Sequence, residues 1–151
     1  MVTQLNVTFS DAVTFPDYVS NAFRLRRTGP SGPTGDIFAG GVLEGSTLGL
    51  SFPYGNSLVD GNYELTLYSS KIVGANGNLD GNGDGIPGDD LVFTFHRLFG
   101  DANGDRRVDV TDFAVFRSVF GTPSLVFDFN NDGSINSADF VQFRVRFGLT
   151  I

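Results

Sequence analysis

The chain has 151 residues and no cysteine, and its 10 Lys and Arg against 17 Asp and Glu give a net charge of −7. The absence of cysteine excludes disulfide bonds, and the negative net charge argues against a nucleic-acid partner. With one histidine and no cysteine, the sequence gives no support for a zinc site, and without a phosphate-binding loop it gives none for nucleotide chemistry. No apolar run approaches the roughly 20 residues that span a bilayer, and no signal segment opens the chain, as expected of a piece of a longer protein.

Short alternating segments dominate the first two-thirds of the chain. Apolar and polar residues alternate in the period of half-buried strands at 4–13, 23–26, 47–52 and 63–68, and residues 91–95 are predicted to form a further strand. The interval 28–41 contains prolines and many glycines, and we predict that it is a loop. Short strands separated by turn signals predict an antiparallel sandwich.

Two stretches of this half resemble bacterial immunoglobulin-like modules. One is the strand and turn from Val7 to Val13, with the sequence Val-Thr-Phe-Ser-Asp-Ala-Val, and the other runs from Leu58 to Leu67. The resemblance covers residues 1–97 and implies an immunoglobulin-like β-sandwich that serves as a spacer or stalk in an extracellular protein. This half of the sequence shows no catalytic constellation.

A stretch rich in Gly and Asp, before the last predicted strand, partly follows the spacing of a twelve-residue calcium loop. The first, third and fifth places fit, but Leu91 stands at the twelfth place and a strand follows. A third calcium site would therefore need a later aspartate to close a shortened loop. A plain turn cluster explains the stretch equally well. The residues that would hold this ion are Asp80, Asn82, Asp84, the carbonyl of Ile86, and Asp89 or Asp90.

Two complete loops of this kind follow. Oxygen-bearing side chains stand at places 1, 3, 5, 9 and 12 from Asp101 onward, and the pattern returns 27 positions later at Asp128. Loops with this spacing wrap around a Ca²⁺ ion and lead into a helix, so the two loops predict two bound ions. The alternative is that both stretches are acidic turns at the start of a helix and bind no metal. In the first loop the predicted ligands are Asp101, Asn103, Asp105, the Arg107 carbonyl, Asp109 (directly or through water) and Asp112. In the second they are Asp128, Asn130, Asp132, the Ser134 carbonyl, Asn136 and Asp139.

The two loops differ at the sixth place, where the chain must turn sharply. Gly133 stands there in the second loop and Arg106 in the first. A left-handed conformation at an arginine costs about 1 kcal/mol or more. We therefore expect the second loop to be better preformed and the first to be the weaker or more distorted site.

Phenylalanines mark one face of a predicted helix after each loop. They stand at i, i+3 and i+7, as Phe113, Phe116 and Phe120 and again as Phe140, Phe143 and Phe147. Gly121 and Gly148 follow where a left-handed helix-ending residue is expected. Neither helix can bury its face alone, so we expect the two to pack on each other. The change of period near residues 96–100 places the domain boundary between a domain at 1–97 and a domain at 98–151.

Two loop-helix units of this length, with Asp-x-Asn-x-Asp and Asp at the twelfth place, resemble a type I dockerin over about residues 100–150. Dockerins are calcium-dependent modules that bind cohesin domains and attach enzymes or surface proteins to scaffolds. The resemblance implies partner-facing residues early and midway along each helix. They are Val110, Thr111, Arg117 and Ser118 in the first helix, and Ser137, Ala138, Arg144 and Val145 in the second. The two arginines are equally well explained as solvated charges near a helix C-terminus.

The expected fold is an all-β immunoglobulin-like antiparallel sandwich followed by a small all-α dockerin with two EF-hand-like calcium loop-helix units. We predict a non-catalytic module that binds a cohesin-like domain, with no small-molecule substrate, and tethers a larger extracellular or cell-surface protein to a scaffold. One alternative is a calcium-stabilised terminal cap without a cohesin partner. Another is a non-catalytic appendage of a polysaccharide-degrading enzyme, whose catalytic domain lies elsewhere on a longer chain.

Overall fold

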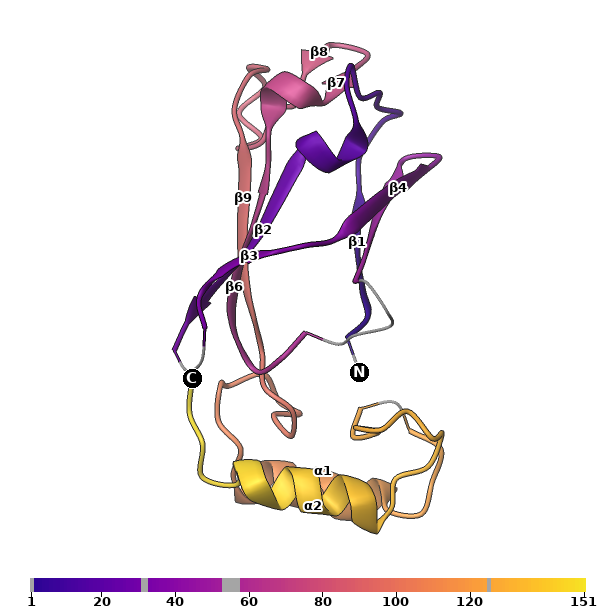
Figure 1. Ribbon diagram of the computed structural model, residues 1–151, viewed down its shortest axis with the longest axis vertical. Helices are drawn as coiled ribbons and strands as arrows, with labels where there is room; N and C mark the ends of the chain where they lie inside the picture. The colour runs from indigo at the N-terminus through magenta and orange to yellow at the C-terminus, as the bar shows by residue number, and fades with distance from the viewer. Residues whose placement is uncertain (1, 31–32, 53–57, 125) are drawn as a thin grey trace. The chain divides into compact units, whose positions relative to one another are not determined.

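The computed structural model describes residues 2–30, 33–52, 58–124 and 126–151 (Figure 1). Its tertiary contacts divide the chain into two compact units. One unit contains residues 2–57 and 62–95, and the other contains residues 58–61 together with 96–151. The short segment 58–61 thus belongs to the C-terminal unit although it lies far from it in sequence. We describe each unit by itself.

The strands that the structure describes in the N-terminal half form three sheets. A three-stranded sheet has the order β1 (Gln4–Thr8), β5 (Thr47–Ser51), β4 (Gly40–Glu44), with antiparallel pairing. A four-stranded sheet has the order β3 (Gly35–Ile37), β2 (Phe23–Gly29), β6 (Gly61–Leu67), β9 (Leu91–Arg97). The strands β7 (Val73–Gly74) and β8 (Gly77–Asn78) form a small hairpin, and two short 3₁₀ turns lie at Val19–Asn21 and Ser69–Lys71.

The predicted alternation of apolar and polar residues accounts for the buried face of these sheets. In β6 every second residue is buried, and β2 pairs with it so that Leu25 lies opposite Leu65. Leu48 and Leu50 are the buried residues of β5. A Cβ added to Gly41 of β4 would lie 2.9 Å from the ring of Phe23 in β2, so this glycine lets the backbone of one sheet approach a side chain of the other.

The predicted loop at 28–41 is wrong in part. It contains the end of β2, all of β3 and the start of β4, because Ile37 pairs with Leu25 across the sheet. Cross-strand pairing overrides the local turn preference of Gly and Pro here. The predicted strand 4–13 is also too long, since β1 ends at Thr8.

The C-terminal unit contains helices α1 (Val110–Val119) and α2 (Ser137–Arg146). Each helix begins three residues before the predicted phenylalanine face, because a capping box closes its first turn. Gly121 and Gly148 follow the helices with φ of 80° and 87°, which confirms the predicted left-handed residues. No helix in the described ranges is long and apolar enough to cross a membrane.

The two helices pack on each other through the predicted faces. The rings of Phe116 and Phe143 lie 5.1 Å apart, and both side chains are almost fully buried. The eighth residue of each loop pairs with the chain that follows the helix of the other repeat: Gly148 N donates to Val108 O at 2.8 Å, and Gly121 N donates to Ile135 O at 2.8 Å. The repeats therefore share one core and exchange backbone hydrogen bonds, as a duplicated unit requires.

Candidate functional site

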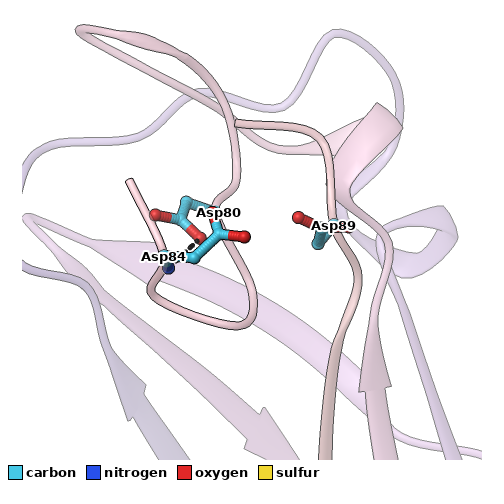
Figure 2. Close-up of side chains that lie close together, drawn as sticks. All are labelled: Asp80, Asp84 and Asp89. Atoms are coloured by element: carbon cyan, nitrogen blue, oxygen red, sulfur yellow. Dashed lines mark hydrogen bonds between the residues drawn. The ribbon is translucent and has the colours of Figure 1, made fainter. Parts of the chain in front are cut away.

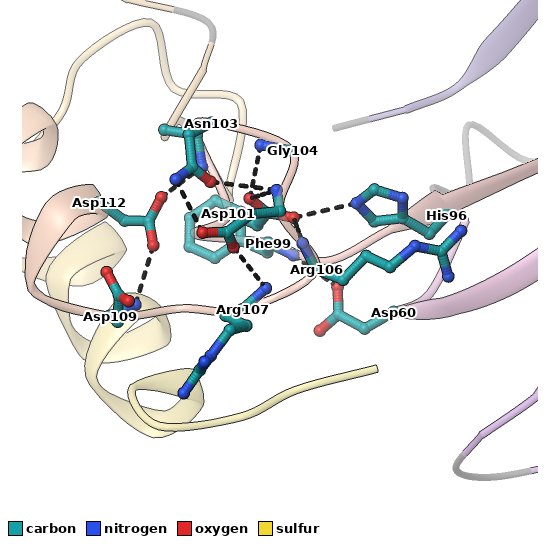
Figure 3. Close-up of polar contacts among 12 residues, drawn as sticks. Asp60, His96, Phe99, Asp101, Asn103, Gly104, Arg106, Arg107, Asp109 and Asp112 are labelled. Atoms are coloured by element: carbon teal, nitrogen blue, oxygen red, sulfur yellow. Dashed lines mark hydrogen bonds and ion pairs between the residues drawn. The ribbon is translucent and has the colours of Figure 1, made fainter.

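The first carboxylate of each loop is held by backbone N–H groups of the same loop, as Figure 3 shows for Asp101. Asp101 Oδ1 accepts from Gly104 N at 2.7 Å, and Oδ2 accepts from Arg106 N at 2.9 Å. In the second loop Asp128 Oδ2 accepts from Gly133 N at 2.9 Å, in the same way. These backbone N–H groups surround the first aspartate, so each loop is folded around that carboxylate.

The twelfth-place aspartates connect each loop to its helix. Asp112 accepts from Ala102 N and Asp109 N, both at 2.8 Å, and Asp139 accepts from the equivalent N–H groups of Phe129 and Asn136 at 2.8 and 2.9 Å. Both carboxylates are completely buried. The first turn of each helix is thereby tied back to the beginning of its loop.

This donor set fits a hard cation. The side chains that line each loop offer carboxylate and amide oxygens, which are the ligands that Ca²⁺ prefers. Buried Asp112, Asp128 and Asp139 in so small a unit are costly unless a positive charge neutralises them. The residues that would hold the ions are those predicted from the spacing, and a bound Ca²⁺ would supply the neutralising charge.

Two predicted ligands also act as helix caps. Asp109 Oδ1 accepts from Thr111 N at 2.8 Å, and Asn136 Oδ1 accepts from Ala138 N at 2.8 Å. The cap uses the single side-chain oxygen of Asn136, whereas Asp109 has a second carboxylate oxygen besides the one that caps the helix.

Asp132 is stabilised in its ionised form. Hydrogen bonds from the side chain of Asn130, then from the side chain of Asn136 and the backbone N–H of Ser134, hold the pKa of Asp132 below its usual range. The carboxylate at the fifth place of the second loop therefore keeps its negative charge to a lower pH than an ordinary aspartate does.

The backbone is left-handed at the same two places in both loops, but the glycine stands at the fourth place in the first loop and at the sixth place in the second. Both the fourth and the sixth place are left-handed: φ is 78° at Gly104 and 70° at Arg106 in the first loop, and 60° at Asn131 and 83° at Gly133 in the second. Each loop therefore contains one glycine and one left-handed residue with a side chain. Arg106 adopts the left-handed conformation that costs an arginine free energy, and asparagine tolerates this conformation better than arginine does. The expected weaker affinity stays a prediction.

The stretch after β8 folds like the beginning of these loops. Asp80 Oδ1 accepts from Gly83 N at 2.8 Å and Oδ2 accepts from Gly85 N at 2.8 Å, and both glycines are left-handed. Carboxylate oxygens of Asp80, Asp84 and Asp89 lie within 4.8 Å of one another (Figure 2). The first five places of a calcium loop are thus reproduced in the N-terminal unit.

The structure distinguishes Asp89 from Asp90 as the aspartate that would close this shorter loop. Gly81 N, at the second place, donates to the carbonyl of Asp89 at 3.0 Å, where the other loops use the twelfth-place carboxylate. Asp90 is engaged elsewhere, because its Oδ1 accepts from Ser69 N at 2.7 Å. The geometry therefore favours Asp89 over Asp90.

The eight predicted partner-facing residues are all exposed on the helices. Two of them, Arg117 and Arg144, each line one of two shallow grooves of about 390 and 330 Å³, which are equivalent under the repeat. Each is lined by three phenylalanines and the arginine of one helix and by the first phenylalanine of the other: Phe113, Phe116, Arg117, Phe120 and Phe140, and Phe140, Phe143, Arg144, Phe147 and Phe113.

Sequence reasoning missed these grooves. It assigned Phe120 and Phe147 to the buried face, whereas they are 52% and 47% exposed. Both stand at the C-cap, after the last helical residue, where the chain leaves the helix and the predicted period no longer holds. Only the assembled helix pair reveals that the face ends in an open groove.

Comparison with known proteins identifies the C-terminal region. The family model described as the dockerin type I domain matches residues 99–146. No curated protein and no solved structure matches the chain. Dockerin domains bind calcium, and they are non-catalytic modules for calcium-dependent protein–protein interaction whose general partner is cohesin. Residues 99–146 of this chain are therefore a dockerin type I domain.

Proposed function

We propose that this chain is a calcium-dependent docking module. Two Ca²⁺ ions fold the dockerin domain, and a cohesin-type domain binds the exposed sides of its helices. The observation that carries the proposal is the pair of completely buried twelfth-place aspartates, Asp112 and Asp139, each closing a loop of oxygen donors. A cation would further stabilise these buried carboxylates beyond the backbone N–H groups that they accept from, and a metal that binds the folded form couples folding to calcium.

The partner surface follows from the exposed side chains. Arg117 and Arg144 lie at equivalent rims of the two aromatic grooves, and the guanidinium of Arg117 lies 6.0 Å from the ring of Phe113. An arginine beside an apolar groove suits a partner that presents a carboxylate next to an apolar side chain. Val110 and Val145, two more of the predicted partner-facing residues, are exposed apolar side chains on the same helices.

The N-terminal half serves as an immunoglobulin-like β-sandwich spacer in this proposal, with the boundary between residues 97 and 98. The alternating burial of β2 and β6 and the approach of Gly41 to Phe23 support two sheets that pack face to face. The whole would tether a larger extracellular or cell-surface protein, such as a polysaccharide-degrading enzyme, to a scaffold.

Calcium-coupled folding is tested with a chelator. Circular dichroism at 222 nm is expected to lose most of its helical signal on addition of EGTA and to regain it with excess Ca²⁺. Asp112→Asn and Asp139→Asn are expected to prevent the recovery, whereas the exposed Asp11→Asn serves as a matched control. Helicity that EGTA leaves unchanged would contradict the proposal.

Partner binding is tested separately with surface variants. Pull-down of the calcium-loaded protein by a broad panel of cohesin domains is expected to find a partner. Arg117→Ala with Arg144→Ala is then expected to weaken that binding about tenfold or more without loss of helicity. Arg26→Ala, an exposed arginine of β2, is the control. If no cohesin binds, the structural alternative of a calcium-stabilised terminal cap is favoured.

We also propose a third Ca²⁺ at Asp80, Asn82, Asp84 and Asp89, with the Ile86 carbonyl. The supporting observation is the reproduction of the first five places of the dockerin loops. Calorimetric titration is expected to give three ions per chain, and Asp84→Asn is expected to give two. The exposed Asp36→Asn is the control. A wild-type stoichiometry of two would rule out this site while leaving the dockerin sites intact.

A further inference from the structure

His96 contacts the first calcium loop from outside it. The residue lies near the end of β9, and its Nε2 is 2.9 Å from Oδ2 of Asp101 (Figure 3). The His96 side chain is 20% exposed and that of Asp101 is 1% exposed. An ionised carboxylate can only accept, so Nε2 is the protonated nitrogen and donates this hydrogen bond.

The contact fixes one oxygen of the carboxylate. Asp101 Oδ2 accepts from His96 and from Arg106 N, whereas Oδ1 accepts from Gly104 N and Asp105 N within the loop. Two donors on Oδ2 set the rotation of the carboxylate about its Cβ–Cγ bond. The direction of Oδ1 is thereby set as well.

The backbone that carries His96 is itself anchored. Arg97 Nη1 donates to Asp60 Oδ1, and Phe99 N donates to the same oxygen at 2.8 Å. Leu98 and Phe99 are buried in the core shared by the two helices. The imidazole is therefore presented to Asp101 from a fixed position.

The second loop has no equivalent donor at this sequence position. The residue that corresponds to His96 under the repeat is Pro123, whose side chain carries no hydrogen-bond donor. The sequence of the second repeat therefore does not repeat the His96 contact at the matching position.

We propose that His96 is a positioning residue for the first calcium loop, which makes calcium affinity at that loop depend on the end of β9. This inference rests on the proposed binding of Ca²⁺ at Asp101–Asp112. Hydrogen-bond partners of metal-ligating carboxylates typically contribute 10- to 100-fold in metal affinity, and the lower end suits a partly exposed imidazole.

A calcium titration followed by NMR measures the calcium midpoint of each loop separately, from the backbone amide signals of that loop. Gly104 reports the first loop and Gly133 the second. His96→Ala is expected to raise the midpoint of the first loop about tenfold relative to that of the second. His96→Gln, whose amide N–H can still donate to Asp101, is expected to restore the ratio to within about threefold. In the calcium-free wild type, the imidazole ¹⁵N shifts are expected to show a proton on Nε2, the nitrogen that faces Asp101.

The ratio of the two calcium midpoints distinguishes a specific role of His96 at the first loop from a general effect on the stability of the domain. A general loss of stability raises both midpoints together, so an unchanged ratio in His96→Ala overturns the proposal. An altered ratio that His96→Gln does not restore overturns it too. If the wild type binds no calcium at either loop, the proposed function itself fails; binding at both loops with an unchanged ratio leaves that function standing.

Discussion

Asp60 and Arg146 lie 86 positions apart in sequence and form an ion pair, with Arg146 Nε donating to Asp60 Oδ2 at 2.5 Å. The other oxygen of Asp60 accepts from Arg97 Nη1 and Phe99 N. The guanidinium of Arg146 lies 5.0 Å from the ring of Phe129. The carboxylate therefore joins the beginning of the C-terminal unit to the end of its second helix.

Asp60→Asn is expected to destabilise the C-terminal unit by about 2 kcal/mol. It leaves two mostly buried guanidinium groups without their counter-charge, and the partial exposure of the site reduces the effect from the 3–5 kcal/mol of a fully buried pair. Urea unfolding at saturating calcium, followed by circular dichroism, measures it. Asp36→Asn breaks the exposed pair with Arg24 and is expected to cost less than about 1 kcal/mol. Equal effects in the two variants would contradict a structural role for Asp60.

Arg106→Gly is expected to stabilise the calcium-free first loop by about 0.5–1 kcal/mol. The variant relieves a left-handed residue with a side chain, and the N–H that donates to Asp101 is retained. The gain appears as a lower calcium midpoint at Gly104. The converse change, Gly133→Arg, is expected to raise the midpoint at the second loop. A lower calcium midpoint at the second loop in Gly133→Arg would show that the left-handed φ at the sixth place does not limit calcium binding.

Phe143→Ala is expected to cost about 3–5 kcal/mol, which would unfold much of so small a unit. Its ring is 1% exposed and lies against Phe116 and Phe127. Phe147→Ala, on the open groove at 47% exposure, is the matched control and is expected to cost about 1 kcal/mol. Thermal unfolding with excess calcium measures both. Similar losses in the two variants would mean that the groove is part of the core.

Asp17 makes stability depend on pH in the N-terminal unit. Hydrogen bonds from the side chain of Asn21, then from Tyr18 N, with a contribution from Lys71, lower the pKa of Asp17. A folded-state pKa below the unfolded value gives stability that is present above about pH 4 and is lost as pH falls through the folded pKa. The stability difference between wild type and Asp17→Asn, measured by urea unfolding, is therefore expected to shrink on acidification. A difference that grows in acid would reverse the assigned sign.

The residue spacing alone predicted the loop ligands, the paired phenylalanine faces and the helix-ending glycines. These features depend on contacts within about a dozen residues, so they leave a regular pattern in the sequence. The alternating strands were predicted for the same reason. The repeat of 27 positions, from Asp101 to Asp128, also indicated that the two helices share one core.

Only the tertiary structure decided the role of residues whose partners are distant in sequence. Asp60 reads locally as part of a turn, yet it binds Arg97 and Arg146 because the chain folds back over dozens of residues. The strand β3 forms within a Gly- and Pro-rich stretch because β2 offers it a pairing edge. His96 is an isolated histidine in the sequence, and its contact with Asp101 arises when the end of β9 turns into the first loop. Local spacing determines where the oxygen-bearing side chains stand in each loop, whereas non-local packing determines what holds those loops in place.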